Sequence, residues 1–133
     1  MIVKRFLFWI PSIVWAIILF SLSNTPGNEL PSLKFGLDKL AHISVYCIFS
    51  YLLIFAFTNS IHKDYFHKIY YSFLIAFLYG VFEEYHQLFV QGRFFSYGDM
   101  YANLIGSVAG VLIWHFNIFH HKEKILKLIG LSK

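Results

Sequence analysis

Residues 40–57 read LAHISVYCIFSYLLIFAF, a run without Lys, Arg, Asp or Glu. As a helix, a run of this length covers roughly 25–30 Å, close to the thickness of the hydrocarbon layer of a membrane. Further apolar runs cover about residues 6–22, 66–90 and 100–119. Backbone in lipid must satisfy its own hydrogen bonds, and these runs do not alternate as barrel strands do. The sequence therefore predicts a bundle of four transmembrane helices.

The composition indicates the same class of protein. Hydrophobic residues make up 58% of the 133 residues and charged residues 14%, against roughly 45–50% and about 25% in soluble domains. A small soluble domain could not cover this apolar excess, which excludes a disordered chain, a disulfide-stapled secreted domain and an ordinary cytosolic enzyme. We expect one all-α integral membrane domain over residues 1–133, multi-pass in the cell membrane and surrounded by membrane lipids.

The positive charges set the expected orientation. With the N-terminus inside, eight Lys and Arg residues lie on the inner side of the four predicted helices and three lie on the outer side. Because cytoplasmic loops carry the excess of Lys and Arg, both termini are expected in the cytoplasm, with residues 120–133 as a basic tail. The same flanking placement accounts for the net charge of +4, so no nucleic-acid partner is expected.

The first apolar run also resembles a cleaved signal peptide. Lys4 and Arg5 precede it, and residues 21–23 (SLS) resemble a cleavage site with small residues. The run is long for the apolar core of a signal peptide, and it contains Pro11 and two tryptophans. We therefore expect it to be retained as the first helix.

The predicted topology gathers polar residues at the outer side. The second predicted helix starts there, the third ends there and the fourth starts there. Asp38, His42 and Tyr46 are spaced i, i+4 and i+8, so they share one helix face, and Asp99 and Asn103 are also one turn apart. Small residues recur on the same helix as Asn103 and allow a close neighbour: Ala102, Gly106 and Gly110. We expect inward-facing polar stripes around a pocket open to the outside.

Glu84 lies inside the third apolar run, roughly 9 Å below its expected outer end. A carboxylate at that depth costs about 2–3 kcal/mol or more unless it faces the bundle interior or finds a partner. We expect Arg93, His42 or Asn103 as that partner. The candidate catalytic residues are Glu84, His42 and Asp99. The candidate substrate-binding residues are Arg93, Asp38, Tyr46, Gln87, Ser96 and Asn103.

Structural roles compete with these assignments. Asp38 fits a helix N-cap, Ser96 and Asp99 fit an S-x-x-D capping box, and Arg93 fits an anchor to outer-leaflet phosphates. The sequence has no H-E-x-x-H pair or similar ligand spacing, so we expect neither a metal nor a cofactor. A metal held by the three candidate catalytic residues remains a conceivable variant.

The order of these residues resembles the VanZ-like family. Residues 38–46 resemble its D-K-x-x-H-x-x-x-Y segment and residues 84–89 its E-x-x-Q-x-F segment. Residues 92–110 resemble its G-R-x-x-S-x-x-D-x-x-x-N-x-x-G-x-x-x-G segment. The chain departs from the family at Gln91, where Pro is common, and at Glu83, where Asp is frequent. The resemblance implies a small helical membrane domain, a cell-envelope context and a link to teicoplanin resistance, and it implies no cofactor.

Three functions fit these observations, and the oligomeric state is left open. The chain could modify a lipid-linked or peptidoglycan-related envelope molecule at the outer face, with Glu84 as acid or base. It could instead bind an envelope precursor, or alter the access of a glycopeptide, without any reaction. The alternative is a structural or accessory subunit of a membrane complex. The sequence leaves open whether the protein is an enzyme.

Overall fold

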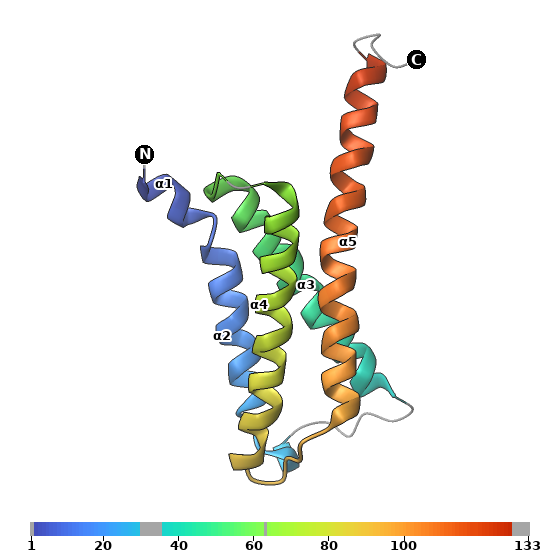
Figure 1. Ribbon diagram of the computed structural model, residues 1–133. Coiled ribbons are helices and arrows are strands. Elements are labelled where there is room, and N and C mark those ends of the chain that lie inside the picture. The colour runs from blue at the N-terminus through green and yellow to red at the C-terminus, as the bar shows by residue number, and fades with distance from the viewer. Residues whose placement is uncertain (1, 30–35, 63, 129–133) are drawn as a thin grey trace.

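The computed structural model describes residues 2–29, 36–62 and 64–128. Across these residues the chain forms helices and no strand, which confirms the all-α prediction (Figure 1). The elements are, in order, α1 (Ile2–Leu7), α2 (Ile10–Ser23), the short 3-10 helix η1 (Gly27–Glu29), α3 (Leu37–Ser60), α4 (Tyr65–His86), the 3-10 helix η2 (Gln87–Phe89) and α5 (Tyr97–Leu128).

The break between α1 and α2 follows from Pro11, which lies in the first turn of α2. A proline ring removes a backbone donor and clashes with the carbonyl four residues earlier, so it is tolerated at the start of a helix and not in its interior. The Ser12 hydroxyl donates a hydrogen bond to the Trp9 carbonyl at 2.9 Å. The first predicted helix is therefore two helices, with a bend between them (Figure 1).

Among the residues that the structure describes, three stretches of helix are long and apolar enough to cross a membrane: Arg5–Ser23, Leu37–Ser60 and Tyr97–Ile118. α4 is not among them, because its tyrosines, Lys68 and two glutamates lower its mean hydropathy. Large apolar side chains nevertheless remain exposed on α4 as on the other helices, with Leu78 at 54% and Ile105 on α5 at 55%. An apolar outer surface of this kind is typical of a membrane protein.

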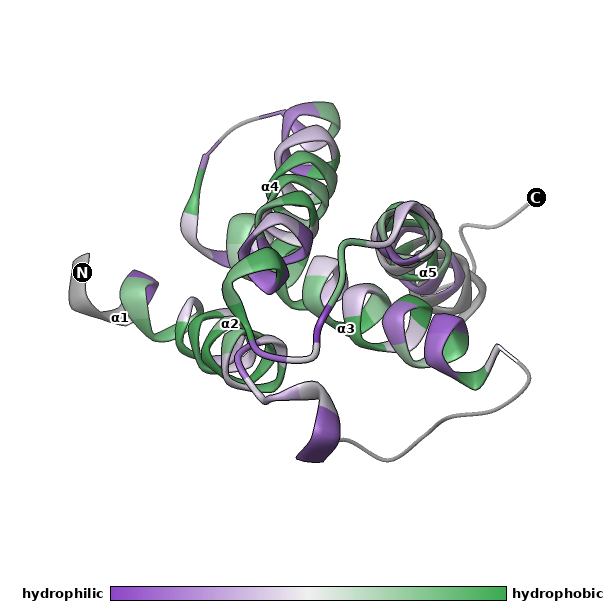
Figure 2. Cartoon of the chain, turned by 90° about the horizontal axis from the view of Figure 1, so that it is seen from below, coloured by the Kyte–Doolittle hydropathy of each residue, from purple (hydrophilic) through white to green (hydrophobic). Residues whose placement is uncertain are grey.

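The helices run up and down the bundle, so alternate connections meet at the same end. α1, the end of α5 and the connection between α3 and α4 lie at one end, and the connections that follow α2 and α4 lie at the other (Figure 1). Viewed from that second end, α3 lies between the pair α2 and α4 on one side and α5 on the other (Figure 2). α3 contacts all three of these helices and packs most extensively on α5.

The stripe of small residues lies at the contact between α3 and α5, as its spacing predicts. A Cβ atom at Gly106 would lie 2.4 Å from the Ile43 carbonyl oxygen, and one at Gly110 would lie 2.1 Å from the Cys47 carbonyl oxygen. The backbones of the two helices therefore approach so closely that only glycine fits at these two positions.

α2 is attached to the bundle by side-chain hydrogen bonds as well as by apolar packing. The Trp15 indole N–H donates to the Val45 carbonyl on α3 at 3.0 Å, and the Tyr79 hydroxyl on α4 donates to the Ala16 carbonyl at 2.7 Å. Leu19 of α2 is buried in the core cluster beside these contacts. α2 thus packs along α3 and α4 as one side of the bundle.

The helix ends differ from the expected ranges. The third run was expected to continue as helix to about residue 90, but α4 ends at His86, η2 tightens the chain and Val90 is extended. The second and fourth helices are longer than expected, since α3 begins at Leu37 and α5 runs from Tyr97 to Leu128. Residues 120–128 contain good helix formers and neither Gly nor Pro, so α5 continues well beyond the apolar run.

Candidate functional site

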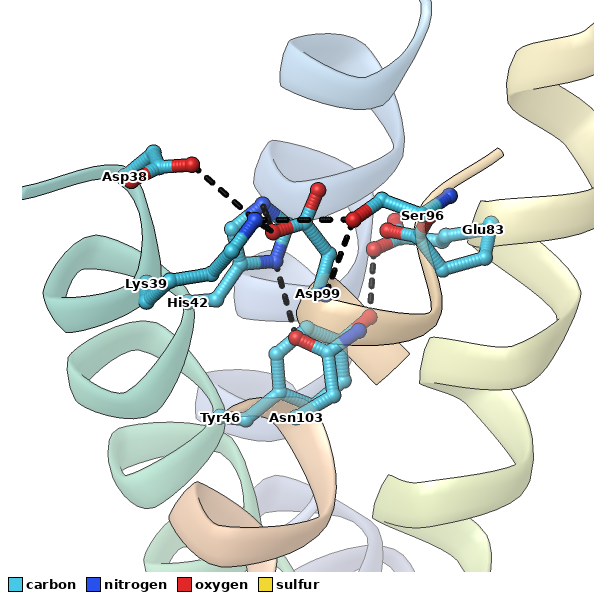
Figure 3. A network of polar contacts seen from close by, with 9 residues as sticks. Asp38, Lys39, His42, Tyr46, Glu83, Ser96, Asp99 and Asn103 are labelled. Atoms are coloured by element: carbon cyan, nitrogen blue, oxygen red, sulfur yellow. Dashed lines mark hydrogen bonds and ion pairs between the residues drawn. The ribbon is translucent and has the colours of Figure 1, made fainter. Parts of the chain in front are cut away.

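Polar side chains converge where α3 begins, α4 ends and α5 begins (Figure 3). Several of them are almost completely buried, with exposures of 1% for Tyr46, 0% for Glu84, 4% for Gln87 and 1% for Asn103. The structure brings all nine candidate site residues to this end of the bundle, either in one network of polar contacts or around one cavity.

Lys39 belongs to this network, although it was not among the candidate residues that we selected from the sequence. Its ammonium group lies 3.0 Å from Asp38 Oδ2 and contacts Asp99 Oδ1, so it joins α3 to the start of α5. The hydroxyl of Ser96 is 3.5 Å from the same nitrogen. Lys39 follows Asp38 directly and precedes His42 by one turn, which is the signal that could have identified it.

Arg93 does not pair with Glu84, although it was one of the three partners expected for that acid. Within the described ranges Arg93 forms no ion pair with Glu84 or Asp99, and Asp99 is paired with Lys39 instead. Lys39 can reach Asp99 because the first turns of α3 and α5 lie side by side (Figure 3). Arg93 lies in the connection before α5 and lines the cavity described below.

The start of α5 shows half of the expected capping box. Ser96 Oγ accepts a hydrogen bond from the Asp99 backbone N–H at 3.2 Å, as a capping residue does. In a complete box the acid three residues later would accept the Ser96 N–H. Here Glu84 Oε2 accepts it at 3.1 Å from the neighbouring helix α4. Asp99 is thereby left free to pair with Lys39.

Asp38 is not the N-cap of α3, which was its alternative role. The N-cap is Gly36, whose φ of 74° lies in the left-handed region that favours glycine. Asp38 lies in the first turn, where a negative charge is favourable beside the positive end of the helix dipole. Its carboxylate lines the cavity and contacts Lys39.

His42 connects α3 to α5 one turn deeper in the bundle. Its Nδ1 lies 2.8 Å from Asn103 Oδ1, and its Nε2 lies 3.9 Å from Asp99 Oδ1. The Asn103 amide nitrogen is buried and has no hydrogen-bond partner in the described part of the chain. His42 therefore faces a carboxylate on one side and an amide on the other (Figure 3).

Glu83 is a second residue that the sequence analysis left out of the candidate site. It is 5% exposed, and its Oε2 accepts a hydrogen bond from the Tyr46 hydroxyl at 2.5 Å. Gly80, one turn earlier on α4, permits this contact, because a Cβ there would lie 2.9 Å from the Tyr46 ring and from the Asn103 amide. Glu83 precedes the selected Gln87 by one helical turn, and that spacing could have identified it.

A cavity of about 430 Å³ lies beside this network. One wall is mostly apolar and is formed by Leu19 and Leu22 of α2 with Ala41 and Val45 of α3, with the Ser23 hydroxyl as its one polar group. Polar side chains line the remainder: Asp38, His42, Tyr46, Glu83, Gln87 and Arg93. A cavity with an apolar wall, two carboxylates and a guanidinium group suits a ligand that has both an apolar and a charged part.

The network also contains donors of the kind that bind metal ions. One ring nitrogen of His42 and one carboxylate oxygen each of Glu84 and Asp99 lie within 4.8 Å of one another. The sequence led us to expect no metal site, because these residues come from three separate helices and have no recognisable ligand spacing. Only the packing of the helices brings them together.

The chain is similar to one known family of proteins over most of its length. A family model described as VanZ/LLP1 matches residues 6–120, which confirms the resemblance seen in the sequence. No curated protein and no solved structure matches the chain.

Proposed function

This chain belongs to the VanZ/LLP1 family, and from that premise we propose that it binds or modifies an anionic amphiphile of the cell envelope. The ligand class is a lipid-linked or peptidoglycan-related precursor, held at the outer face of the cell membrane. Through that molecule, or by altering how a glycopeptide reaches the membrane surface, the protein affects susceptibility to teicoplanin-type antibiotics.

The proposal includes a fourth membrane crossing by α4. This helix has 22 residues, which correspond to about 33 Å. Most of its exposed side chains are apolar or aromatic, including Leu78 and Phe82 at 54% and 53% exposure, whereas Glu83 and Glu84 are buried. An acid that faces the bundle interior avoids most of the cost of insertion into lipid. With four crossings, the excess of Lys and Arg that the sequence assigns to the cytoplasmic side favours an outward-facing cavity.

The single observation that carries the proposal is the composition of the cavity. Its wall from α2 is mostly apolar, and Arg93 lines the cavity without an ion-pair partner among the residues that the structure describes. A guanidinium group that is not paired with a carboxylate of the protein is suited to bind a phosphate or carboxylate of a ligand in a bidentate manner. An apolar tail against Leu19 and Leu22, with a charged group at Arg93, matches a lipid-linked headgroup.

Both a reaction and simple binding fit this cavity. Glu84 is buried and is not among the described residues that line the cavity, so in a reaction it acts as the general acid or base through His42, which does line it. The Ser96 N–H orients the Glu84 carboxylate. His42, which has a donor atom within 4.8 Å of one of the Glu84 oxygens, shares the proton. In simple binding, the polar groups that line the cavity only recognise the headgroup.

A susceptibility assay tests the proposal. Cells that express Glu84→Gln or Arg93→Gln should lose the change in teicoplanin susceptibility that the native chain confers, while the amount of protein in the membrane is unchanged. Glu29→Gln is the matched control, because Glu29 is an exposed acid at the same end of the bundle and outside the cavity lining. Full activity of the Glu84 and Arg93 variants would refute the proposal.

Mass spectrometry of lipid-linked precursors separates the two modes. A species that appears or disappears with the native chain and not with Glu84→Gln indicates a reaction. An unchanged set of lipids together with an altered susceptibility indicates binding.

A structural or accessory role is the second candidate, because the polar contacts themselves hold the helices together. Lys39 with Asp99 joins α3 to α5, and Tyr46 with Glu83 joins α3 to α4. In this case substitutions at Glu84, Asp99 and Asn103 would lower the abundance of the protein together with its function.

A further inference from the structure

The three donors in the polar network come from different helices but share one small volume. His42 lies on α3, Glu84 on α4 and Asp99 on α5, and one donor atom from each lies within 4.8 Å of the others. One imidazole nitrogen with two carboxylate oxygens is a donor set that suits divalent ions such as Zn²⁺ and Mn²⁺. The distance between donors is of the size that a single ion could span after small side-chain adjustments.

The ring of His42 is oriented as that of a metal ligand would be. Its Nδ1 lies 2.8 Å from Asn103 Oδ1, so a proton on Nδ1 is donated to the amide oxygen and Nε2 carries the lone pair. Nε2 is 3.9 Å from Asp99 Oδ1, which is too long for a hydrogen bond. Two acceptor atoms thus face one another at a separation that leaves room for a cation between them (Figure 3).

Glu84 has a buried carboxylate oxygen that no described residue contacts by a hydrogen bond. Its side chain is 0% exposed, and only one carboxylate oxygen has a partner, the Ser96 N–H at 3.1 Å. The other oxygen, Oε1, is buried and accepts no hydrogen bond from any residue that the structure describes. Buried carboxylate oxygens are normally paired or coordinate a metal. A bound cation would therefore supply the missing partner of Glu84 Oε1.

The ammonium group of Lys39 already neutralises one of the three donors. Its ammonium group contacts the Asp99 carboxylate and also lies 3.0 Å from Asp38. An ammonium and a divalent ion cannot both lie against the same Asp99 oxygen, because like charges at that distance repel. A bound ion therefore displaces the ammonium group from Asp99 and leaves it on Asp38.

We propose that His42, Glu84 and Asp99 bind one divalent ion of the Zn²⁺ or Mn²⁺ class, and that Lys39 competes with this ion for Asp99. Three protein ligands leave at least one coordination position open. Because His42 also lines the cavity, an ion at this point would present the open position near a ligand bound there. The site itself does not depend on what the cavity binds.

Equilibrium dialysis of the purified, chelator-treated full chain in detergent tests this site, with Zn²⁺ and Mn²⁺ in separate experiments. The native chain should bind one ion of at least one of these metals. His42→Ala, Glu84→Gln and Asp99→Asn should each raise Kd by tenfold or more. His67→Ala is the matched control, because His67 faces Asp64 at 3.7 Å at the other end of the bundle, and it should bind as the native chain does.

Lys39→Met keeps all three ligands and removes the competitor, so it should lower Kd several-fold. A native chain that binds neither ion, or donor variants that bind as tightly as the control, would overturn the site. Unchanged or weaker binding by Lys39→Met would overturn the competition. If the donor variants fail to fold, X-ray absorption of the Zn²⁺-loaded native chain decides the matter. One imidazole with oxygen ligands supports the site, whereas sulfur or several imidazoles contradict it.

Discussion

The buried pair of Tyr46 and Glu83 is the residue-scale feature that links α3 to α4. The hydroxyl donates to the carboxylate at 2.5 Å while the two side chains are 1% and 5% exposed. The second carboxylate oxygen of Glu83 is already without a partner in the part of the chain that the structure describes. Loss of the hydroxyl would therefore leave the whole carboxylate without a side-chain donor.

We expect Tyr46→Phe to lower the free energy of unfolding by about 1–3 kcal/mol, since a buried acceptor then loses its donor. Thermal unfolding of the purified chain in detergent measures this change. Tyr101→Phe is the control, because Tyr101 is 61% exposed. This variant should unfold as the native chain does. Equal unfolding of the two variants would show that the Tyr46 bond contributes no net stability.

At this scale the sequence identifies residues but not their partners. Helical spacing correctly placed His42 and Tyr46 on one face with Asp38. It could not show that Lys39 rather than Arg93 pairs with Asp99, because that choice depends on the distance between two helix starts that are far apart in the chain.

At the scale of elements, the contact between α3 and α5 organises the site. Gly106 and Gly110 bring the two backbones together, and the same approach places His42 beside Asn103 at 2.8 Å. Helix packing and site geometry therefore depend on the same small residues.

We expect Gly106→Ala to destabilise the chain by about 1–3 kcal/mol, the usual cost of overpacking a well-packed contact. The added Cβ would lie 2.4 Å from the Ile43 carbonyl oxygen, a backbone atom that cannot move aside easily. Intrinsic helix propensity acts in the opposite direction and favours Ala over Gly by about 1 kcal/mol, so a loss of stability reports the packing.

Val108→Ala on the exposed side of α5 is the matched control for the glycine variant, since Val108 is 39% exposed. Thermal unfolding in detergent should separate the two variants clearly. A Gly106→Ala chain as stable as the control would contradict the close approach of α3 and α5.

The ends of the elements were only partly predictable. Hydropathy located the apolar centre of each helix, because apolar runs are a local property of the chain. It placed the end of α4 too late and the end of α5 too early, since the turn at Gln87–Phe89 and the continuation to Leu128 are not marked by hydropathy.

At the scale of the whole molecule, successive connections lie at opposite ends of the bundle (Figure 1). The residues that line the polar cavity belong to the end that holds the connections after α2 and α4. The backbone N–H of Gly27 donates to the Gln91 carbonyl at 3.0 Å and ties these two connections together. Our proposal for the function requires this end to face the outside of the cell.

Cysteine labelling in intact cells tests that orientation. In a background with Cys47→Ser, which removes the one native cysteine, a membrane-impermeant maleimide should label Gln91→Cys from outside. Asp64→Cys at the other end should be labelled only after permeabilisation, and both native side chains are exposed. The reverse pattern would place the cavity in the cytoplasm and refute an outer-face ligand.

The sequence by itself determined the class of this protein, its helical elements and its family, because hydropathy, helical spacing and motif order are all written along one chain. It also indicated which polar residues meet at one end of the bundle. Only the tertiary structure decided which groups pair, such as Lys39 with Asp99 and Glu84 with the Ser96 N–H. These choices depend on distances of a few ångströms between separate helices, and those distances are set by how closely the helices pack.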